Sequence, residues 1–275
     1  MNTASSRPAP TGTLRLVLPD FRPIDTVAQR SEPFALWPIG PRPLLAWWLD
    51  EAVRRNVATV QLLVRADVDQ IRTFIEKSEY WSRRIEIIEE GFDGSAAESV
   101  TTMPGAAPTQ PPQDGPGLLR LWLELHSRWL HLPRDPNSPS IDREIAPGVW
   151  VAPHARISAT ARLHGPCWIG ESAVIEDGCV IGPDVAIGAS AVIDGEAEID
   201  HSVVQPQTYV GRALRLHEVV ADASTLLDAR RGVSVAIPDR FLLAPLQSTG
   251  LSPFARCAAR WIPRFFAPSR RGAIA

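Results

Sequence analysis

The chain has 275 residues and a formal net charge of −3, with 45% hydrophobic and 21% charged residues. This balance is typical of a globular protein with a core, and the small net charge excludes the strongly basic field of nucleic-acid-binding proteins. No stretch reaches the ~18 apolar residues of a membrane-spanning helix, and the first 12 residues lack the apolar core of a secretory signal. The three cysteines show neither metal-ligand spacing nor a disulfide framework, so we expect a cytoplasmic protein.

Residues 12 to 91 alternate strand-like apolar runs with helical patterns. The apolar spacing predicts strands at 13–18, 57–64 and 84–89 and helices at 43–55 and 67–77. Strands that alternate with helices are typical of a parallel sheet, so we expect an α/β domain over residues 12–91.

Two segments separate this domain from the rest of the chain. Residues 92–117 are rich in Gly, Ala, Pro, Ser and Thr, which predicts a disordered linker. Residues 118–132 (LLRLWLELHSRWLHL) have the spacing of an amphipathic helix, which ends before Pro133.

A six-residue repeat dominates the second half of the chain. Every sixth residue from Ile145 is a branched aliphatic: Ile145, Val151, Ile157, Leu163, Ile169, Ile175, Ile181, Ile187, Ile193 and Ile199. The fourth residue after each is small or apolar: Val149, Ala155, Ala161, Cys167, Ala173, Cys179, Val185, Ala191, Ala197 and Val203. Both rows are expected to point into a solenoid of triangular section, in which three hexads form one coil and each coil buries its neighbours. The two cysteines of the second row are then packing residues.

The rows decay after Gln205, and irregular apolar pairs follow up to residue 240. We therefore expect a capped β-helix over 141–240, and an association of copies through it into a homo-oligomer. Residues 241–275 form a different segment: six arginines and one acidic residue occur from Asp239 to the end, among Phe and Trp side chains. Such a segment suits a protein partner or an anionic membrane surface, which would place the protein at the periphery of the inner membrane.

The string PIGPRPLL (38–45), followed by the helical and strand patterns to residue 64, resembles sugar-phosphate nucleotidyltransferases, in which a P-x-G-x-x-P-L motif opens a helix. Mannose-1-phosphate guanylyltransferases and glucose-1-phosphate adenylyltransferases also carry a carboxy-terminal hexapeptide-repeat β-helix. The resemblance covers residues 13–91 and 118–240. It implies a Rossmann-type sheet followed by a left-handed parallel β-helix, and substrate binding by Arg30, Pro38, Gly40 and Arg42.

The sequence departs from this family at its catalytic positions. The family's glycine-rich phosphate loop is replaced by PDFRPID (19–25), and Glu32 stands where a cation precedes the motif. The only lysine, Lys77, lies in a predicted helix, and the short linker replaces the family's middle section with its metal-binding aspartate. We therefore assign no catalytic residue and no metal, and expect a degenerate member that scaffolds or regulates nucleotide-sugar supply for polysaccharide assembly.

Three alternatives stay open. An active sugar-1-phosphate nucleotidyltransferase would use Mg²⁺ and an altered phosphate site with Arg30 and Arg42. A hexapeptide-repeat acyltransferase would use a solenoid histidine as general base, for which His154, His164 and His201 are available; the absence of a loop between the hexads argues against it. A structural adaptor would bind a membrane or a partner through the tail.

Overall fold

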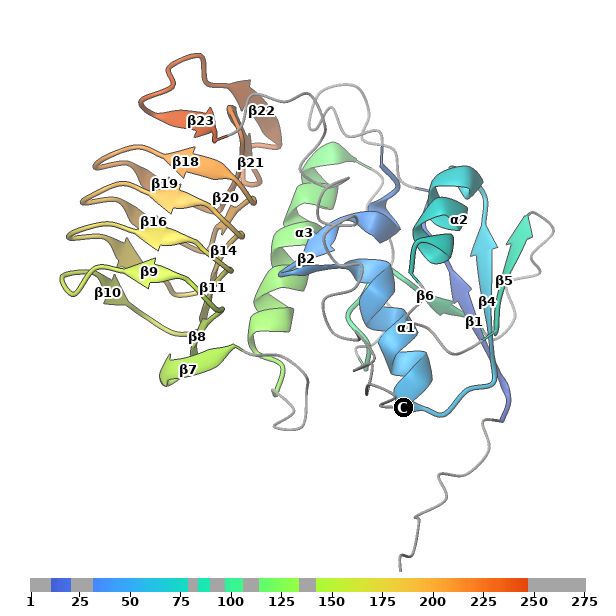
Figure 1. Ribbon diagram of the computed structural model, residues 1–275. Coiled ribbons are helices and arrows are strands. Elements are labelled where there is room, and N and C mark those ends of the chain that lie inside the picture. The colour runs from blue at the N-terminus through green and yellow to red at the C-terminus, as the bar shows by residue number, and fades with distance from the viewer. Residues whose placement is uncertain are drawn as a thin grey trace, which may run out of the picture.

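A computed structural model describes residues 11–20, 32–78, 84–89, 97–105, 114–133 and 142–246. A β-solenoid and an α/β part lie side by side, and helix α3 (Gly115–Leu130) runs between them (Figure 1). The expected order of an α/β part followed by a left-handed parallel β-helix is confirmed.

The α/β part is built on a four-stranded parallel sheet in the order β5-β4-β1-β6. The predicted strands are confirmed within two residues, and both predicted helices within one. The elements are β1 (Thr13–Val17), η1 (Phe34–Leu36), β2 (Pro38–Ile39), β3 (Arg42–Pro43), α1 (Leu44–Arg54), β4 (Thr59–Val64), α2 (Val68–Glu76), β5 (Arg84–Glu89) and β6 (Glu98–Ser99).

Part of the predicted linker belongs to this sheet, so the linker prediction is wrong at residues 97–105. Strand β6 pairs with β1, and Val100, Thr101 and Thr102 after it are buried. The indole Nε1 of Trp48 donates to the carbonyl of Thr102 at 2.8 Å. The weak strand propensity of this short segment is overridden because its backbone bonds to an open sheet edge.

Helix α3 begins three residues before its predicted start. Its amino terminus is capped by Asp114, whose side chain accepts from the amide of Gly117 at 2.7 Å, and Pro116 occupies the first turn. Leu119, Trp122, Leu125 and Trp129 are buried to within 1% exposure, so α3 contributes a continuous apolar face.

Three stacked sheets form the sides of the solenoid. One has the order β10-β13-β16-β19, one β23-β18-β15-β12-β9, and one β22-β21-β20-β17-β14-β11-β8-β7. The strands are β7 (Arg143–Ala146), β8 (Val149–Val151), β9 (Arg156–Ile157), β10 (Arg162–Leu163), β11 (Cys167–Ile169), β12 (Val174–Ile175), β13 (Val180–Ile181), β14 (Val185–Ile187), β15 (Val192–Ile193), β16 (Glu198–Asp200), β17 (Val203–Val204), β18 (Thr208–Val210), β19 (Arg215–His217), β20 (Val219–Asp222), β21 (Thr225–Asp228), β22 (Val233–Ala236) and β23 (Leu243–Pro245).

The aliphatic row fills the solenoid core as expected, with one exception. The six isoleucines from Ile169 to Ile199 are at most 1% exposed, and burial raises the pKa of Cys167 in the second row to about 12. Ile145 is 52% exposed instead, because β7 turns back antiparallel to β8 and leaves the core. The row therefore starts inside the solenoid only after Ile145.

The predicted decay after Gln205 is wrong, because the repeat continues with one residue missing. The register pairs Ile187 with Val204, Ile193 with Val210, and Ile199 with Leu216, so the six-residue spacing resumes five residues after Ile199. The second row then holds Ser202 and Thr208, both fully buried. Ser202 donates to the carbonyl of Asp200 at 2.6 Å, and the hydroxyl of Thr208 accepts from the amide of Ala223 at 3.0 Å.

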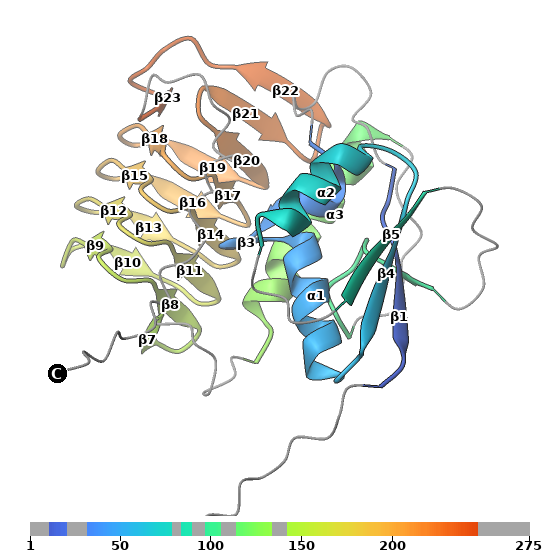
Figure 2. The same ribbon diagram turned by 45° about the vertical axis from the view of Figure 1, so that its right-hand side comes forward.

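Val203, predicted for the interior row, faces the other way. It lies in an outward column of the long sheet in which each member is in register with the next: Trp150, Trp168, Ala186, Val203, Val220 and Leu227. Most of this column shares one hydrophobic cluster with α1 and α3. The long sheet is thus apolar on both faces, which is why α3 docks on it (Figure 2).

Antiparallel strands close the far end of the solenoid, as the expected cap requires. Strands β20, β21 and β22 form a meander, and β23 pairs antiparallel with β18. Strand β23 therefore belongs to the cap, although it falls in the segment predicted as the tail. Residues from 247 onward lie outside the described part. No helix in the described ranges has the length and apolarity to cross a bilayer.

Candidate functional site

Two of the residues assigned from the nucleotidyltransferase resemblance, Pro38 and Gly40, lie where the α/β part meets α3. Arg30 lies outside the described residues. Pro38 is buried, and its carbonyl accepts from the indole of Trp122 at 2.8 Å. Gly40 has φ +60°, and a Cβ there would stand 2.4 Å from the ring of Trp129. The structure thus packs the P-x-G turn against two tryptophans of α3.

Arg42 is held by two side chains of helix α1. Its guanidinium pairs with Asp50 and lies 5.1 Å from the ring centre of Trp47, and its side chain is only 12% exposed. These contacts orient α1 on the β2–β3 hairpin. Substrate binding by Pro38, Gly40 and Arg42 stays a prediction, and each of them has a packing role that the sequence did not reveal.

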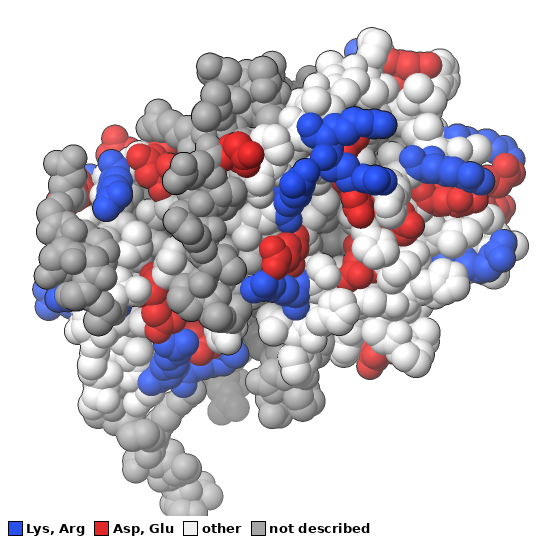
Figure 3. All heavy atoms as spheres, turned by 180° about the vertical axis from the view of Figure 1, so that it is seen from behind, with Lys and Arg blue, Asp and Glu red and all other residues white. Residues whose placement is uncertain are grey.

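A cleft of about 540 Å³ lies between α3 and the solenoid. Its lining mixes ionisable and apolar side chains from both parts: Arg120, Leu123, Glu124, His126, Ser127, Asp184, His201, Val203, Glu218, Ala229 and Arg230. Acidic and basic side chains alternate over the face of the molecule opposite to that of Figure 1, so no single-signed field covers that face (Figure 3).

One corner of the solenoid supplies three ionisable side chains to this cleft. Asp184, His201 and Glu218 follow strands of the same sheet in successive coils, and all three have left-handed backbone with φ between 45° and 54°. The amide of His201 donates to the carbonyl of Pro183 at 2.9 Å, which fixes the stacking of the two corners. The corner geometry therefore projects a carboxylate, an imidazole and a carboxylate in a vertical row.

Asp184 joins the solenoid to α3. The hydroxyl of Ser127 donates to its Oδ1 at 2.8 Å, and Nδ1 of His131 lies 3.7 Å from the same oxygen. Its second oxygen lies 3.7 Å from Nε2 of His201. Ser127 thus anchors a carboxylate whose other oxygen faces an imidazole.

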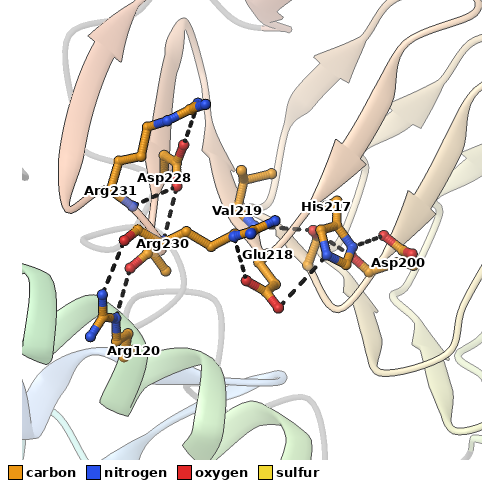
Figure 4. A network of polar contacts seen from close by, with 10 residues as sticks. Arg120, Asp200, His217, Glu218, Val219, Asp228, Arg230 and Arg231 are labelled. Atoms are coloured by element: carbon orange, nitrogen blue, oxygen red, sulfur yellow. Dashed lines mark hydrogen bonds and ion pairs between the residues drawn. The ribbon is translucent and has the colours of Figure 1, made fainter.

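The next pair lies beside this row, on β16 and β19. Asp200 and His217 are register partners, and Nδ1 of His217 is 2.7 Å from Oδ1 of Asp200. Nε2 of His217 lies 3.7 Å from Glu218, whose other oxygen lies 3.4 Å from Nε of Arg230 (Figure 4). The carboxylate of Asp200 therefore holds the imidazole of His217 so that its Nε2 faces Glu218, which lines the cleft.

The two imidazoles form one group. The ring centres of His201 and His217 are 5.7 Å apart in an edge-to-face arrangement, and both side chains are nearly half exposed. An imidazole oriented by a carboxylate and open to solvent can accept a proton from a substrate. The other two solenoid histidines considered from the sequence, His154 and His164, are exposed and do not line the cleft.

His217 was missed in the sequence because it follows the apparent end of the repeat. The signal for it is the one residue that the repeat lacks after Ile199. When the spacing is shortened by one residue there, His217 aligns with Asp200 of the preceding coil, and Glu218 takes the corner position that His201 has in that coil. An alignment of the hexads that allows a one-residue deletion therefore places the side chains of Asp200, His201, His217 and Glu218 together.

The comparisons with known proteins are sparse. None of the protein-family models and none of the curated proteins matches this sequence. A search of solved structures returns a mutant of perosamine N-acetyltransferase from Caulobacter crescentus, in complex with CoA and GDP-perosamine. The identity is 15%, the TM-score is 0.18, and the match covers 60% of this chain and 92% of that one. A similarity at this level carries no argument about function.

Proposed function

We propose that the chain is a hexapeptide-repeat acyltransferase, with His217 as the general base. The observation that carries this proposal is the contact between Nδ1 of His217 and Asp200 at 2.7 Å, beside an open cleft. The carboxylate favours the tautomer with the proton on Nδ1, which leaves a lone pair on Nε2. The nearby Glu218, which lines the cleft, places this nitrogen at the edge of the cleft.

The reaction needs one proton acceptor and two substrates. A hydroxyl or amine of the acceptor attacks the carbonyl carbon of an acyl thioester while Nε2 removes the acceptor's proton. The carbon–sulfur bond then breaks, and the imidazolium returns the proton to the leaving thiolate. No oxidant, metal or nucleotide is consumed, and a positioned base contributes about 10²–10⁴-fold to such a step.

The solenoid and α3 both contribute to the place where the acceptor would bind. Ser127 and Glu124 come from α3, whereas Asp184, His201 and Glu218 come from three coils of the solenoid. The cleft of about 540 Å³ has the size of a small-molecule site. A sugar or a nucleotide sugar, with several hydroxyl groups and apolar ring faces, suits this mixed lining of ionisable and apolar side chains.

The α/β part favours a second function, the degenerate nucleotidyltransferase with a scaffolding role in nucleotide-sugar or polysaccharide biosynthesis. Its supporting observation is Gly40, whose Cα faces the ring of Trp129 closely enough that even a methyl group would collide. A turn packed in this way leaves no space for a ligand group on the face of Gly40 that meets Trp129. On this proposal the α/β part carries α3 to the solenoid without turning over NTP. Self-association through the β-helix, and a protein or membrane partner for the tail, remain proposals.

Acyl transfer is tested by incubating the full chain with acetyl coenzyme A and a panel of amino sugars, neutral sugars and nucleotide sugars, with acetylated product detected by mass spectrometry. We expect product with at least one acceptor and a loss of 10²-fold or more in kcat/KM for His217→Gln. His154→Gln is the matched control, because this histidine is exposed on the same solenoid outside the cleft lining. Wild-type activity in His217→Gln would refute the assignment of the base, and no product with any acceptor would refute the reaction.

The second function has its own assay. Sugar 1-phosphates are mixed with each NTP and Mg²⁺, and pyrophosphate release is followed with the wild-type chain. We expect none above the buffer rate. Sustained pyrophosphate release that falls in Arg42→Ala would overturn the degenerate assignment and favour the active nucleotidyltransferase.

A further inference from the structure

We infer that Asp200, His201 and His217 form a binding site for a zinc-class divalent cation, and that the bound ion switches off His217 as a base. Each residue offers one ligand atom, and these three atoms lie within 4.8 Å of one another. Ion binding requires no acyl transfer and is tested independently of it. The inhibitory consequence rests on the proposed function.

The donor set selects the class of ion. Two imidazoles and one carboxylate match the N and O ligands of Zn²⁺, Co²⁺ or Ni²⁺, whereas Mg²⁺ and Ca²⁺ prefer oxygen alone. Zinc binds histidine nitrogen and carboxylate oxygen at about 2.0–2.2 Å. Side-chain rotations that move each ligand atom by about 1 Å would bring the three atoms from their present spacing to within bonding distance of one ion. All three side chains are between 43% and 48% exposed, so they are free to make that movement.

Each histidine of the trio also has a carboxylate near a ring nitrogen. Asp184 lies 3.7 Å from Nε2 of His201, and Glu218 lies 3.7 Å from Nε2 of His217. Both carboxylates are themselves held, Asp184 by the hydroxyl of Ser127 and Glu218 by Arg230. Metal-binding histidines donate their second ring N–H to such a carboxylate, which fixes the ring and strengthens the ligand.

The ion would join two successive coils of the solenoid. Asp200 and His201 are adjacent in sequence on one coil, and His217 comes from the next coil through the β16–β19 pairing. Three protein ligands leave one tetrahedral position open, as zinc sites with a bound water do. The open position would face solvent beside the cleft.

The ion and the general base compete for one imidazole. Without an ion, Nδ1 of His217 carries the proton and donates it to Asp200, and Nε2 keeps its lone pair. An ion on Nδ1 forces the proton onto Nε2, which lies 3.7 Å from the carboxylate of Glu218. The same histidine then has no free lone pair, so zinc is expected to inhibit acyl transfer without occupying the cleft.

Binding is measured by titration calorimetry of the full, tag-free chain after chelator treatment, with ZnCl₂ as ligand and MgCl₂ as the comparison. We expect one zinc per chain bound by the wild type, and at least a tenfold weaker Kd in His217→Gln and in His201→Asn, whose asparagine suits the left-handed corner. Asp184→Asn tests the carboxylate behind His201 and should weaken binding by about 10–100-fold. His154→Gln should bind as the wild type does, and circular dichroism confirms that each variant is folded.

The inference is overturned if the double variant His201→Asn/His217→Gln keeps the stoichiometry and Kd of the wild type, or if Mg²⁺ binds as tightly as Zn²⁺. The switch is measured separately, by acetylated product at increasing ZnCl₂, where half-inhibition should fall at the calorimetric Kd. Zinc binding without any acetylated product at zero zinc would remove the proposed function and leave the ion site standing. Acetyl transfer that persists undiminished at saturating zinc would remove the switch.

Discussion

Replacing Gly40 with alanine is expected to destabilise the fold strongly, because this glycine lies against a tryptophan that cannot move away. The new Cβ would stand 2.4 Å from two ring atoms of Trp129 and 2.7 Å from a third. Carbon atoms in contact prefer about 3.5–4.0 Å, so the ring has to shift by roughly 1 Å. Trp129 is 1% exposed, and its ring packs against Trp168 at 5.5 Å and Trp47 at 6.2 Å.

The expected cost has two parts. Overpacking of a core by one methyl group costs about 1–3 kcal/mol. A β-carbon in the left-handed region costs a further 1–2 kcal/mol or so, because φ at this position is +60°. Gly40→Ala should therefore lower the free energy of unfolding by about 2–5 kcal/mol.

A substitution at Gly12 distinguishes the overpacking cost from the backbone cost, because φ at this residue is +82° and nothing lies within 4 Å of the position that a Cβ would take. Gly12→Ala should show only the backbone cost of about 1–2 kcal/mol. Urea denaturation followed by tryptophan fluorescence measures both variants. In the double variant Gly40→Ala/Trp129→Leu the smaller side chain should remove most of the clash, so the double variant should lose less than the sum of the two single losses. Equal losses in Gly40→Ala and Gly12→Ala, within about 0.5 kcal/mol, would show that Trp129 does not close this turn.

Two further perturbations test the solenoid. Ile187→Ala should cost about 2–5 kcal/mol because its side chain is fully buried, whereas Ile145→Ala should cost under about 0.5 kcal/mol because that side chain is 52% exposed; equal unfolding free energies for the two would contradict the assigned core. The hydroxyl of Tyr209 donates to Asp194 at 2.6 Å, which raises the pKa of Tyr209 to about 12 and lowers the pKa of Asp194. This contact therefore stabilises the fold between the unfolded pKa of an aspartate, about 4, and that of a tyrosine, about 10. It is lost in acid as pH falls through the lowered pKa, and in alkali as pH rises through about 12. Ultraviolet titration of a Tyr80→Phe chain, whose only tyrosine is Tyr209, should show no ionisation at about pH 10, the ordinary pKa of the side chain.

The sequence predicts most of the fold because each element repeats one period many times. Ten hexads make two rows that agree with each other, and the structure places six consecutive isoleucines of the first row inside the solenoid. The helices α1 and α2 are equally clear, since their apolar stripes are long. Strand β6 could not be predicted: it has two residues and forms only because β1 offers an open edge.

The candidate site was harder to predict, because it depends on one missing residue and on a helix from elsewhere in the chain. The deletion between Ile199 and Val204 shifts the rows, and a strict period of six then reads the next coil as decay. His201 was found and His217 was not for this reason. The docking of α3 does have a signal in the sequence. Trp150, Trp168 and Ala186 are apolar at outward positions spaced 18 residues apart, where neighbouring hexads carry Arg156 and Arg162.

The short coil and the apolar outward column together explain why polar groups gather at this corner. A solenoid side that is apolar on both faces needs a cover, and α3 supplies it by packing on Trp168 and its register partners. Docking brings Ser127 to Asp184, so the corner carboxylate is tied down from outside the repeat. The shortened coil meanwhile sets Asp200 directly below His217 in the ladder. An imidazole with a held carboxylate on one side and an open cleft on the other therefore arises only where both features meet, which is why we place the chemistry at this corner and not along the other coils.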